Sequence, residues 1–246
     1  SYGGFFKRIL KSMDHFFVQN EETKVLLESI EITDVVVSGD TRYDRVLQYK
    51  KDVSETNAIL TKFRTKGPVL IGGSSWEAEE NIIKKFLESN SEMNVIIAPH
   101  NVSKANIKRI ETLYNQPTMR YTEFNEKNDE RILILDTIGH LSAAYQYADY
   151  ALIGGGFSGN LHNILEAGAF GLPVFFGPHH HKFPEAQNFI DGNIGFVIEN
   201  AAQLSEKINA LNHLEEHKQK IEAFMQSQAG ATNKIVNHSF IREILQ

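Results

Sequence analysis

The chain has 246 residues, of which 41% are hydrophobic and 23% are charged, a composition that indicates a globular protein and excludes a disordered one. With 25 Lys and Arg against 31 Asp and Glu, its formal charge is -6, which argues against nucleic acid as a partner. The absence of cysteine excludes disulfides, thiolate metal sites and cysteine nucleophiles. Because no apolar run reaches the roughly 18 residues of a membrane span, we expect this chain to be soluble.

Strand and helix patterns alternate along the whole chain. Short runs that are apolar throughout predict strands buried on both faces of a parallel sheet. The arrangement predicts an α/β fold, a Rossmann-like doubly wound sheet. The expected strands are 15–18, 35–38, 69–71, 95–98, 132–135, 150–153, 174–176 and 195–198, and the expected helices are 21–29, 54–64, 77–87, 104–114, 141–147, 161–170 and 202 to the end.

A boundary is expected near Lys66, Gly67 and Pro68. Six strand candidates follow it, enough for a complete domain, whereas the first 50 residues hold only two. We therefore expect residues 1–50 to be the last part of an N-terminal domain and residues 51–67 to be a linker containing a helix. Residues 68–246, C-terminal helices included, would form a complete Rossmann-like domain.

The most informative loop follows the strand at 150–153. Gly154, Gly155 and Gly156 allow a sharp turn and a close approach to a ligand, and a helix is expected to begin near Leu161. Free N–H groups at a helix start suit a phosphate. The spacing is not that of a dinucleotide-binding loop, so NAD is not inferred. Phosphate binding and a simple tight turn both remain open.

Three polar residues lie just beyond this glycine loop. Asn163 and Glu166 are three positions apart and would share one helical face, where a carboxylate can accept hydrogen bonds from a ribose diol. His162 could donate to a phosphate. The alternative for Glu166 is a charge that complements the helix start.

Polar or glycine-rich loops follow several other strands. They carry Gly73, Ser74 and Ser75 after one strand, His100 after another, and Ile138 with Gly139 after a third. Because the carboxyl ends of parallel strands share one edge, these loops predict a ligand site there. For Ser74 and Ser75, capping of the next helix is the alternative.

His179, His180, His181 and Lys182 follow the strand at 174–176. Adjacent histidines in a loop rarely converge on one ion, and zinc spacings are absent, so no metal site is expected. A cationic rim for an anionic substrate, carried by His179 and Lys182, fits better.

Taken together, the motifs resemble the donor-binding half of the Kdo transferases, which move 3-deoxy-D-manno-octulosonic acid (Kdo) from CMP-Kdo onto lipid A precursors. The similarity spans nearly the whole chain. Its most specific part comprises residues 153–157, 162–167, 171–174 and 177–179, supported by residues 19–22, 39–46, 73–76, 99–100 and 136–141.

The resemblance implies a GT-B glycosyltransferase with the nucleotide in its C-terminal domain. Glu166 would bind the ribose, the glycine loop and helix start would face the phosphate, and Ile138 with Gly139 would approach the base. The general base and the acceptor would lie in the N-terminal domain, so this chain alone would be inactive. The implied nucleotide-sugar site comprises Gly73, Ser74, Ser75, His100, Ile138, Gly139, Gly154, Gly155, Gly156, Phe157, His162, Asn163 and Glu166.

The partners implied are CMP-Kdo as the donor substrate and a lipid A precursor as the acceptor, with no further cofactor. The expected place of action is the cytoplasmic face of the bacterial inner membrane, reached through the full-length protein. Two alternatives stay open: another GT-B protein that uses a UDP-sugar, such as a transferase or a UDP-GlcNAc 2-epimerase, and a nucleotide-binding module without activity of its own.

Overall fold

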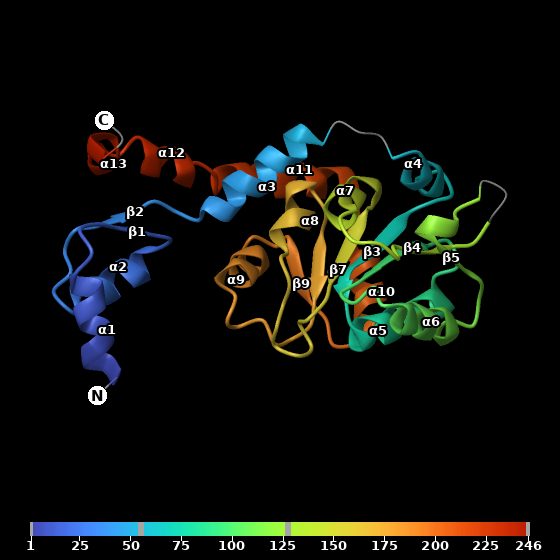
Figure 1. The fold of residues 1–246 in the computed structure, drawn as a ribbon. Coiled ribbons are helices and arrows are strands. Elements are labelled where there is room, and N and C mark those ends of the chain that lie inside the picture. The colour runs from blue at the N-terminus through green and yellow to red at the C-terminus, as the bar shows by residue number, and fades with distance from the viewer. Residues whose placement is uncertain (1, 54–56, 126–128, 245–246) are drawn as a thin grey trace. The chain divides into compact units, whose positions relative to one another are not determined.

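The computed structural model describes residues 2–53, 57–125 and 129–244, which form two compact units (Figure 1). One unit combines residues up to Tyr49 with residues from Met225 onward, and the other spans Lys50–Phe224. The division differs from the expected one, in which all C-terminal helices belong to the larger domain. Residues from 225 onward group instead with the N-terminal part.

The larger unit is built on one seven-stranded sheet in the order β5-β6-β4-β3-β7-β8-β9, and every pair in it is parallel. From β3 the chain first builds outward through β4, and it later returns to the other side of β3 with β7. The loops after β3 and β7 therefore flank the point where strand order reverses, which is where open α/β sheets bind ligands. The strands are β3 (Val69–Ser75), β4 (Asn94–Pro99), β5 (Thr118–Arg120), β6 (Ile132–Ile134), β7 (Tyr150–Ile153), β8 (Val174–Phe176) and β9 (Gly195–Val197).

Helices cover both faces of this sheet (Figure 1). On one face, α5 (Glu77–Ser89), α6 (Lys104–Leu113) and α10 (Ala201–Ala210) bury their apolar sides against alternate residues of the strands, such as Leu70 and Phe175. On the other face, Phe189 of α9 (Pro184–Asp191) packs near Phe176 and Gly195. The remaining elements are α4 (Ala58–Arg64), η1 (Tyr121–Glu123), α7 (Leu141–Ala144), η2 (Tyr145–Tyr147), α8 (Leu165–Ala169) and most of α11 (Leu214–Ser227).

The smaller unit holds a two-stranded parallel sheet whose core includes Val18, Leu27 and Val35. Its C-terminal helices belong to it through polar and aromatic contacts: the Asp44 carboxylate accepts hydrogen bonds from the N–H groups of Gly230 and Thr232, at 2.6 and 2.8 Å. Its elements are α1 (Tyr2–Lys11), β1 (Phe16–Val18), α2 (Glu21–Glu28), β2 (Val35–Val37), most of α3 (Thr41–Asp52), α12 (Ala231–Val236) and α13 (Ser239–Ile244).

All eight expected strands are confirmed, and β5 is an additional one. Of the expected helices, the one from Leu161 is corrected most: α8 begins only at Leu165, because residues 160–164 are held by loop hydrogen bonds such as His162 N–H to Gly154 O, 3.0 Å. The expected helix at 54–64 is described from Asn57, which caps α4, and residues 54–56 lie outside the described residues. Helices α1, α3 and α9 were not expected. Among the described residues, no helix combines the length and apolar character needed to cross a bilayer.

A buried carboxylate ties β7 to the start of the larger unit. Asp149 is 4% exposed and is paired with Arg64 through both guanidinium Nη atoms. Its Oδ2 also accepts the N–H of Val69 at 2.9 Å, and Lys218 Nζ lies 3.5 Å from Oδ1. Charged groups on α4 and α11 thus converge on one buried anion at the beginning of β3 and β7.

We expect Asp149→Asn to lower the free energy of unfolding by about 1–3 kcal/mol, because the amide removes the charge that Arg64 and Lys218 face. Urea unfolding followed by circular dichroism measures this change. Asp129→Asn is the control: Asp129 is exposed and 3.9 Å from Lys66, so its loss should change stability by less than about 0.5 kcal/mol. If both variants unfolded at the same urea concentration, Asp149 would not have the stabilising role described here.

Candidate functional site

The end of β3 is irregular at Ser74. The pairing with β4 runs regularly up to Gly73 and Ala98 and then shifts, so that Ser75 pairs with Pro99 and Ser74 is the extra residue of a bulge. Ser74 has a φ of 49°, in the left-handed region that residues other than glycine rarely adopt. Such strain is found where a fold must present a residue in one orientation. The bulge brings Ser74 to the carboxyl edge of the sheet.

The glycine loop is packed against this bulge and against the end of β8. A Cβ at Gly154 would overlap the carbonyl oxygen of Ser74, one at Gly155 would overlap that of Asn160, and one at Gly156 would overlap the backbone of Gly177. The glycines are therefore required by backbone contact between neighbouring loops. The N–H of Gly154 donates to Gly73 O, which continues the sheet, so this group is already used within the protein.

Two adjacent buried carboxylates at the start of α5 connect the loops of this edge. Glu79, 1% exposed, accepts the N–H groups of Trp76 and Gly155, at 3.0 and 2.9 Å. Burial raises the pKa of Glu79, and the charge of Glu80 acts in the same direction. Glu79, in the first turn of α5, thus also makes a tertiary contact that holds the glycine loop.

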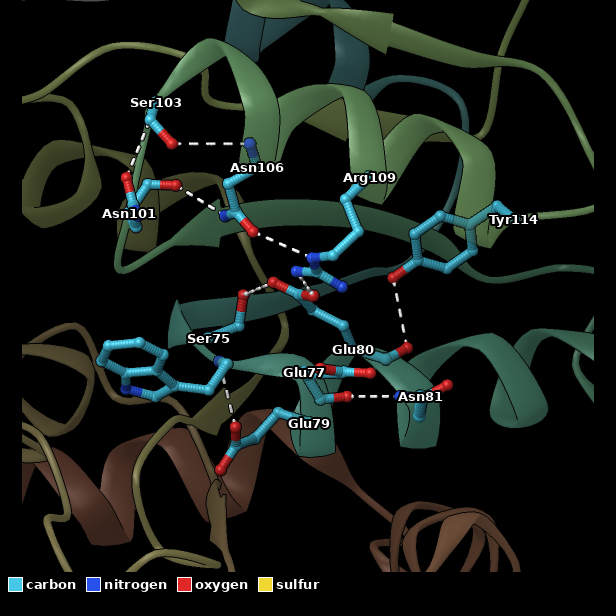
Figure 2. Close-up of polar contacts among 11 residues, drawn as sticks. Ser75, Glu77, Glu79, Glu80, Asn81, Asn101, Ser103, Asn106, Arg109 and Tyr114 are labelled. Atoms are coloured by element: carbon cyan, nitrogen blue, oxygen red, sulfur yellow. Dashed lines mark hydrogen bonds and ion pairs between the residues drawn. The ribbon is translucent and has the colours of Figure 1, made fainter.

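Glu80 is fully buried and connects α5 to the loop after β4 (Figure 2). It accepts a hydrogen bond from Ser75 Oγ at 3.2 Å and is paired with Arg109 of α6. Arg109 Nε in turn donates to Asn106 Oδ1, and Asn106 Nδ2 donates to the carbonyl of Asn101, next to His100. This chain of contacts fixes the β4–α6 loop relative to the β3–α5 turn.

A cavity of about 290 Å³ opens at the switch point between these loops. Its central group is the half-buried Glu166, whose two carboxylate oxygens accept hydrogen bonds from Ser142 Oγ at 2.7 Å and Asn163 Nδ2 at 2.9 Å. Burial raises the pKa of Tyr145 on the cavity wall, and the charge of Glu166 adds to this effect, so Tyr145 is neutral. The lining residues are Ser74, Gly139, Leu141, Ser142, Tyr145, His162, Asn163 and Glu166.

A second, smaller cavity of about 150 Å³ shares Ser74, Gly139 and Leu141 with the first. Its walls are mostly apolar, and Ile138, 86% exposed, lies at its mouth. Thr137 also lines it, and the Thr137 hydroxyl is buried without a hydrogen-bond partner. Buried hydroxyls are normally paired, so this one is available to a ligand. The other lining residues are Ala98, Pro99, His100, Val102 and Leu135.

Three rings from three loops stack beside these cavities. The ring of His100 stacks on the rings of both Trp76 and His162, with centroid distances of 4.4 and 4.6 Å. The Trp76 indole N–H donates to His162 Nε2 at 3.2 Å. Burial lowers the pKa of His162, and the neighbouring His100 adds to this effect, so at neutral pH His162 is an uncharged imidazole.

The histidine run after β8 is divided between core and surface. His179 is exposed beside the glycine loop, where its N–H donates to Gly156 O at 2.8 Å, and Lys182 is exposed. His180 is buried at 5% exposure against Phe176, with its Nδ1 unpartnered. Among the described residues, no group of three or more His, Cys, Asp or Glu side chains is arranged to hold a metal ion.

The structure divides the expected site residues into two groups. Seven line the two cavities: Ser74, His100, Ile138, Gly139, His162, Asn163 and Glu166. The others form the supporting walls: Gly73 leaves room for the Tyr145 hydroxyl, Phe157 packs against the core, and Ser75 and the glycine loop make the contacts above. The sequence analysis did not select Ser142 and Thr137 as cavity residues, because an isolated hydroxyl residue belongs to no recognisable motif. It also assigned no role to Trp76.

A further cavity of about 240 Å³ lies at the opposite, amino edge of the sheet, beside Arg131 just before β6. Arg131 donates to Gln116 Oε1 at 2.8 Å and to the carbonyl of Ser91 at 2.6 Å. Its charge thus supports the turn between α5 and β4, and the cavity is remote from the residues described above.

The larger unit has the Rossmann-like fold that forms the C-terminal half of GT-B glycosyltransferases. Among solved structures, the chain is similar to the C-terminal CMP-Kdo binding domain of WaaA from Acinetobacter baumannii, with a TM-score of 0.58 and 19% identity over 75% of this chain and 98% of that one. It is also similar to a UDP-N-acetylglucosamine 2-epimerase, with a TM-score of 0.55 and 12% identity over 91% of this chain and 57% of that one.

In sequence, the chain is similar to 3-deoxy-D-manno-octulosonic acid transferases. That of Aquifex aeolicus is 27% identical over 60% of this chain and 43% of its own length, and that of Rickettsia prowazekii is 24% identical over 84% and 46%. The resemblance seen in the motifs is thus confirmed. The chain spans about half the length of these relatives or somewhat less. No protein-family model matches it.

We expect Gly156→Ala to destabilise the chain by about 1–3 kcal/mol, because the added methyl group must displace the backbone of Gly177. Thermal unfolding measures this effect. Gly3→Ala is the control, since its Cβ would meet nothing within 4 Å and α1 gains a better helix former. If both variants melted at the wild-type temperature, the loops would not be packed as described.

Proposed function

We propose that this chain is the donor-binding part of a glycosyltransferase that transfers Kdo from CMP-Kdo to a lipid A precursor in lipopolysaccharide core biosynthesis. The observation that carries the proposal is the Glu166 carboxylate, held in a cavity at the switch point of the sheet. The sequence similarity to Kdo transferases over most of the chain supports the choice of sugar.

The ribose of the nucleotide would bind at Glu166. Each oxygen of this carboxylate already accepts one hydrogen bond, from Ser142 and Asn163. An ionised carboxylate has about four acceptor positions, so two remain for the two hydroxyl groups of a ribose. Ser142 and Asn163 hold the carboxylate in place, so a ribose would meet an acceptor that is already oriented.

The cytosine base would occupy the smaller cavity next to the ribose site. Its apolar walls suit a flat ring, and the unpartnered Thr137 hydroxyl can donate to or accept from a polar edge of the base. Ile138 and Gly139 would then contact the base, as the resemblance implies.

The phosphate would lie toward Ser74 and His162, on the side of the cavity nearest the glycine loop. The N–H groups of Gly154 and Gly155 are donated within the protein, so we assign the phosphate contacts to side chains of the cavity. Exposed His179 and Lys182 would form a rim for the carboxylate of the sugar.

The transfer step breaks the bond between the Kdo anomeric carbon and the CMP oxygen, and CMP leaves with the electron pair. The acceptor hydroxyl attacks this carbon and gives its proton to a general base. We propose that no cofactor takes part beyond the donor. By the resemblance, the base and the acceptor site belong to the N-terminal domain, and the complete protein would work at the cytoplasmic face of the inner membrane.

Glu166→Ala should weaken CMP binding about ten- to a hundredfold, because it removes a charge-assisted hydrogen bond that contributes roughly 1.5–3 kcal/mol. Titrations with CMP, UDP, ADP and UDP-GlcNAc by NMR measure these affinities. We expect a wild-type affinity for CMP near the millimolar range, roughly 4 kcal/mol. Glu77→Ala, an exposed first-turn carboxylate of α5, is the control and should leave affinity unchanged. Tighter binding of UDP-GlcNAc than of CMP would favour the UDP-sugar alternative.

Incubated with CMP-Kdo and a lipid A precursor, this chain alone should transfer no sugar, because binding the leaving group does not position an acceptor or remove its proton. Mass spectrometry of the lipid product detects transfer, and a full-length relative such as the Aquifex aeolicus enzyme is the positive control. Transfer at a rate comparable to that enzyme would place the general base within these 246 residues.

A further inference from the structure

Trp76 contributes an unusual contact to the site. Its side chain is 45% exposed, yet its indole N–H is not left to water but donates to His162 Nε2 at 3.2 Å. Its backbone N–H is held separately by the buried carboxylate of Glu79. The position of Trp76 is thus fixed from the protein side, and its side chain reaches from the β3–α5 turn to the loop before α8.

This contact determines which tautomer His162 adopts. An indole nitrogen can only donate, so Nε2 of His162 must accept and carries no proton. The proton of the neutral ring is therefore on Nδ1, although an isolated imidazole side chain favours the opposite tautomer. Among the described residues, Nδ1 makes no hydrogen bond, so it remains available to a ligand in the cavity that His162 lines.

The same contact opposes protonation of the ring. A charged imidazolium would place an N–H on Nε2 directly against the indole N–H. The titratable groups around His162 are His100, in the ring stack, and Glu166, which lines the same cavity. Burial, with His100 adding, already lowers the pKa of His162. Trp76 adds a directional constraint to this environment without adding a charge.

We propose that Trp76 is a positioning residue that holds His162 as a neutral Nδ1–H hydrogen-bond donor for the anionic part of the nucleotide. For the identity of the ligand, this proposal rests on the proposed function. The effect of Trp76 on the tautomer of His162 can be tested without any ligand. Trp76 itself touches no nucleotide atom in this scheme and acts only through His162.

The first test is the tautomer of His162 in the ligand-free chain. Long-range ¹H–¹⁵N spectra should show Nε2 of His162 unprotonated and Nδ1 protonated in the wild type. Trp76→Phe keeps a ring beside His100 but removes the N–H donor. It should shift His162 toward the Nε2–H tautomer and raise its pKa. A wild-type ring with its proton on Nε2, or an unchanged tautomer in Trp76→Phe, would overturn the proposal.

The second test is the pH dependence of CMP affinity, expressed as the ratio of variant to wild type so that titration of the ligand cancels. At pH 8 Trp76→Phe should bind CMP about three- to tenfold more weakly, the loss of one hydrogen bond. At pH 6 the difference in CMP affinity between Trp76→Phe and the wild type should shrink, because a protonated His162 ring donates from both nitrogens. A pH-independent loss would indicate a packing role only and would contradict the proposal.

Two further variants complete the design. In a His162→Asn background the amide does not titrate, so Trp76→Phe should no longer change CMP affinity, as a double-mutant cycle would show. Tyr147→Phe is the structural control: it removes a buried hydroxyl that accepts the Asn57 N–H away from the cavities, and it should leave affinity unchanged. If the wild type binds no CMP, the proposed function fails, while the tautomer spectra still decide the role of Trp76.

Discussion

The carboxyl edge of the sheet depends on the pair of buried carboxylates at the start of α5. Glu79 and Glu80 are adjacent, so they leave the helix in different directions, and each connects to a different neighbouring loop. Two buried anions side by side are costly unless each is fully hydrogen-bonded. Here backbone N–H groups satisfy Glu79, and Ser75 with Arg109 satisfies Glu80. One partner of each carboxylate comes from a distant segment, Gly155 for Glu79 and Arg109 for Glu80, so burial of these charges holds the glycine loop and α6 in place.

This arrangement gives Gly154, Gly155 and Gly156 a structural role. A glycine-rich turn after a central strand is commonly associated with close approach to a phosphate. In this chain Gly154, Gly155 and Gly156 are needed first for the close approach of protein backbone, and two of their N–H groups are already donated. The loop is better described as a rigid support, whose contacts with the bulge at Ser74 and with Gly177 define the wall of the crevice. In the proposed function, the ligand contacts are therefore made by side chains that this wall positions, such as Glu166 and His162.

Much of the larger unit could be predicted from sequence because its strands are apolar throughout and its loops share one edge. Glu166, Asn163 and His162, which the sequence pattern groups together, line one cavity. The sequence pattern gave wrong or missing elements where contacts elsewhere in the fold, or residues without apolar periodicity, determine the local structure. Residues 161–164 look helical, but Asn163 uses its side-chain oxygen to accept the Leu165 N–H, so α8 starts late. β5 is a polar edge strand with no apolar run, and α9 begins at Pro184, a helix start that apolar periodicity does not reveal. Ser142 and Thr137 matter only through their three-dimensional surroundings.

The hydrogen bonds of Glu79 and Glu80 also hold the loops that carry the stacked rings of Trp76 and His100. Glu80, through Arg109 and Asn106, fixes the loop that carries His100, and Glu79 fixes the backbone of Trp76. The ring of His100 stacks on those of Trp76 and His162, the two residues whose hydrogen bond sets the tautomer of His162. A displacement of either loop would change the contacts between these rings and, with them, the walls of the two cavities. The charge state of His162 therefore depends on two carboxylates that never approach the ligand.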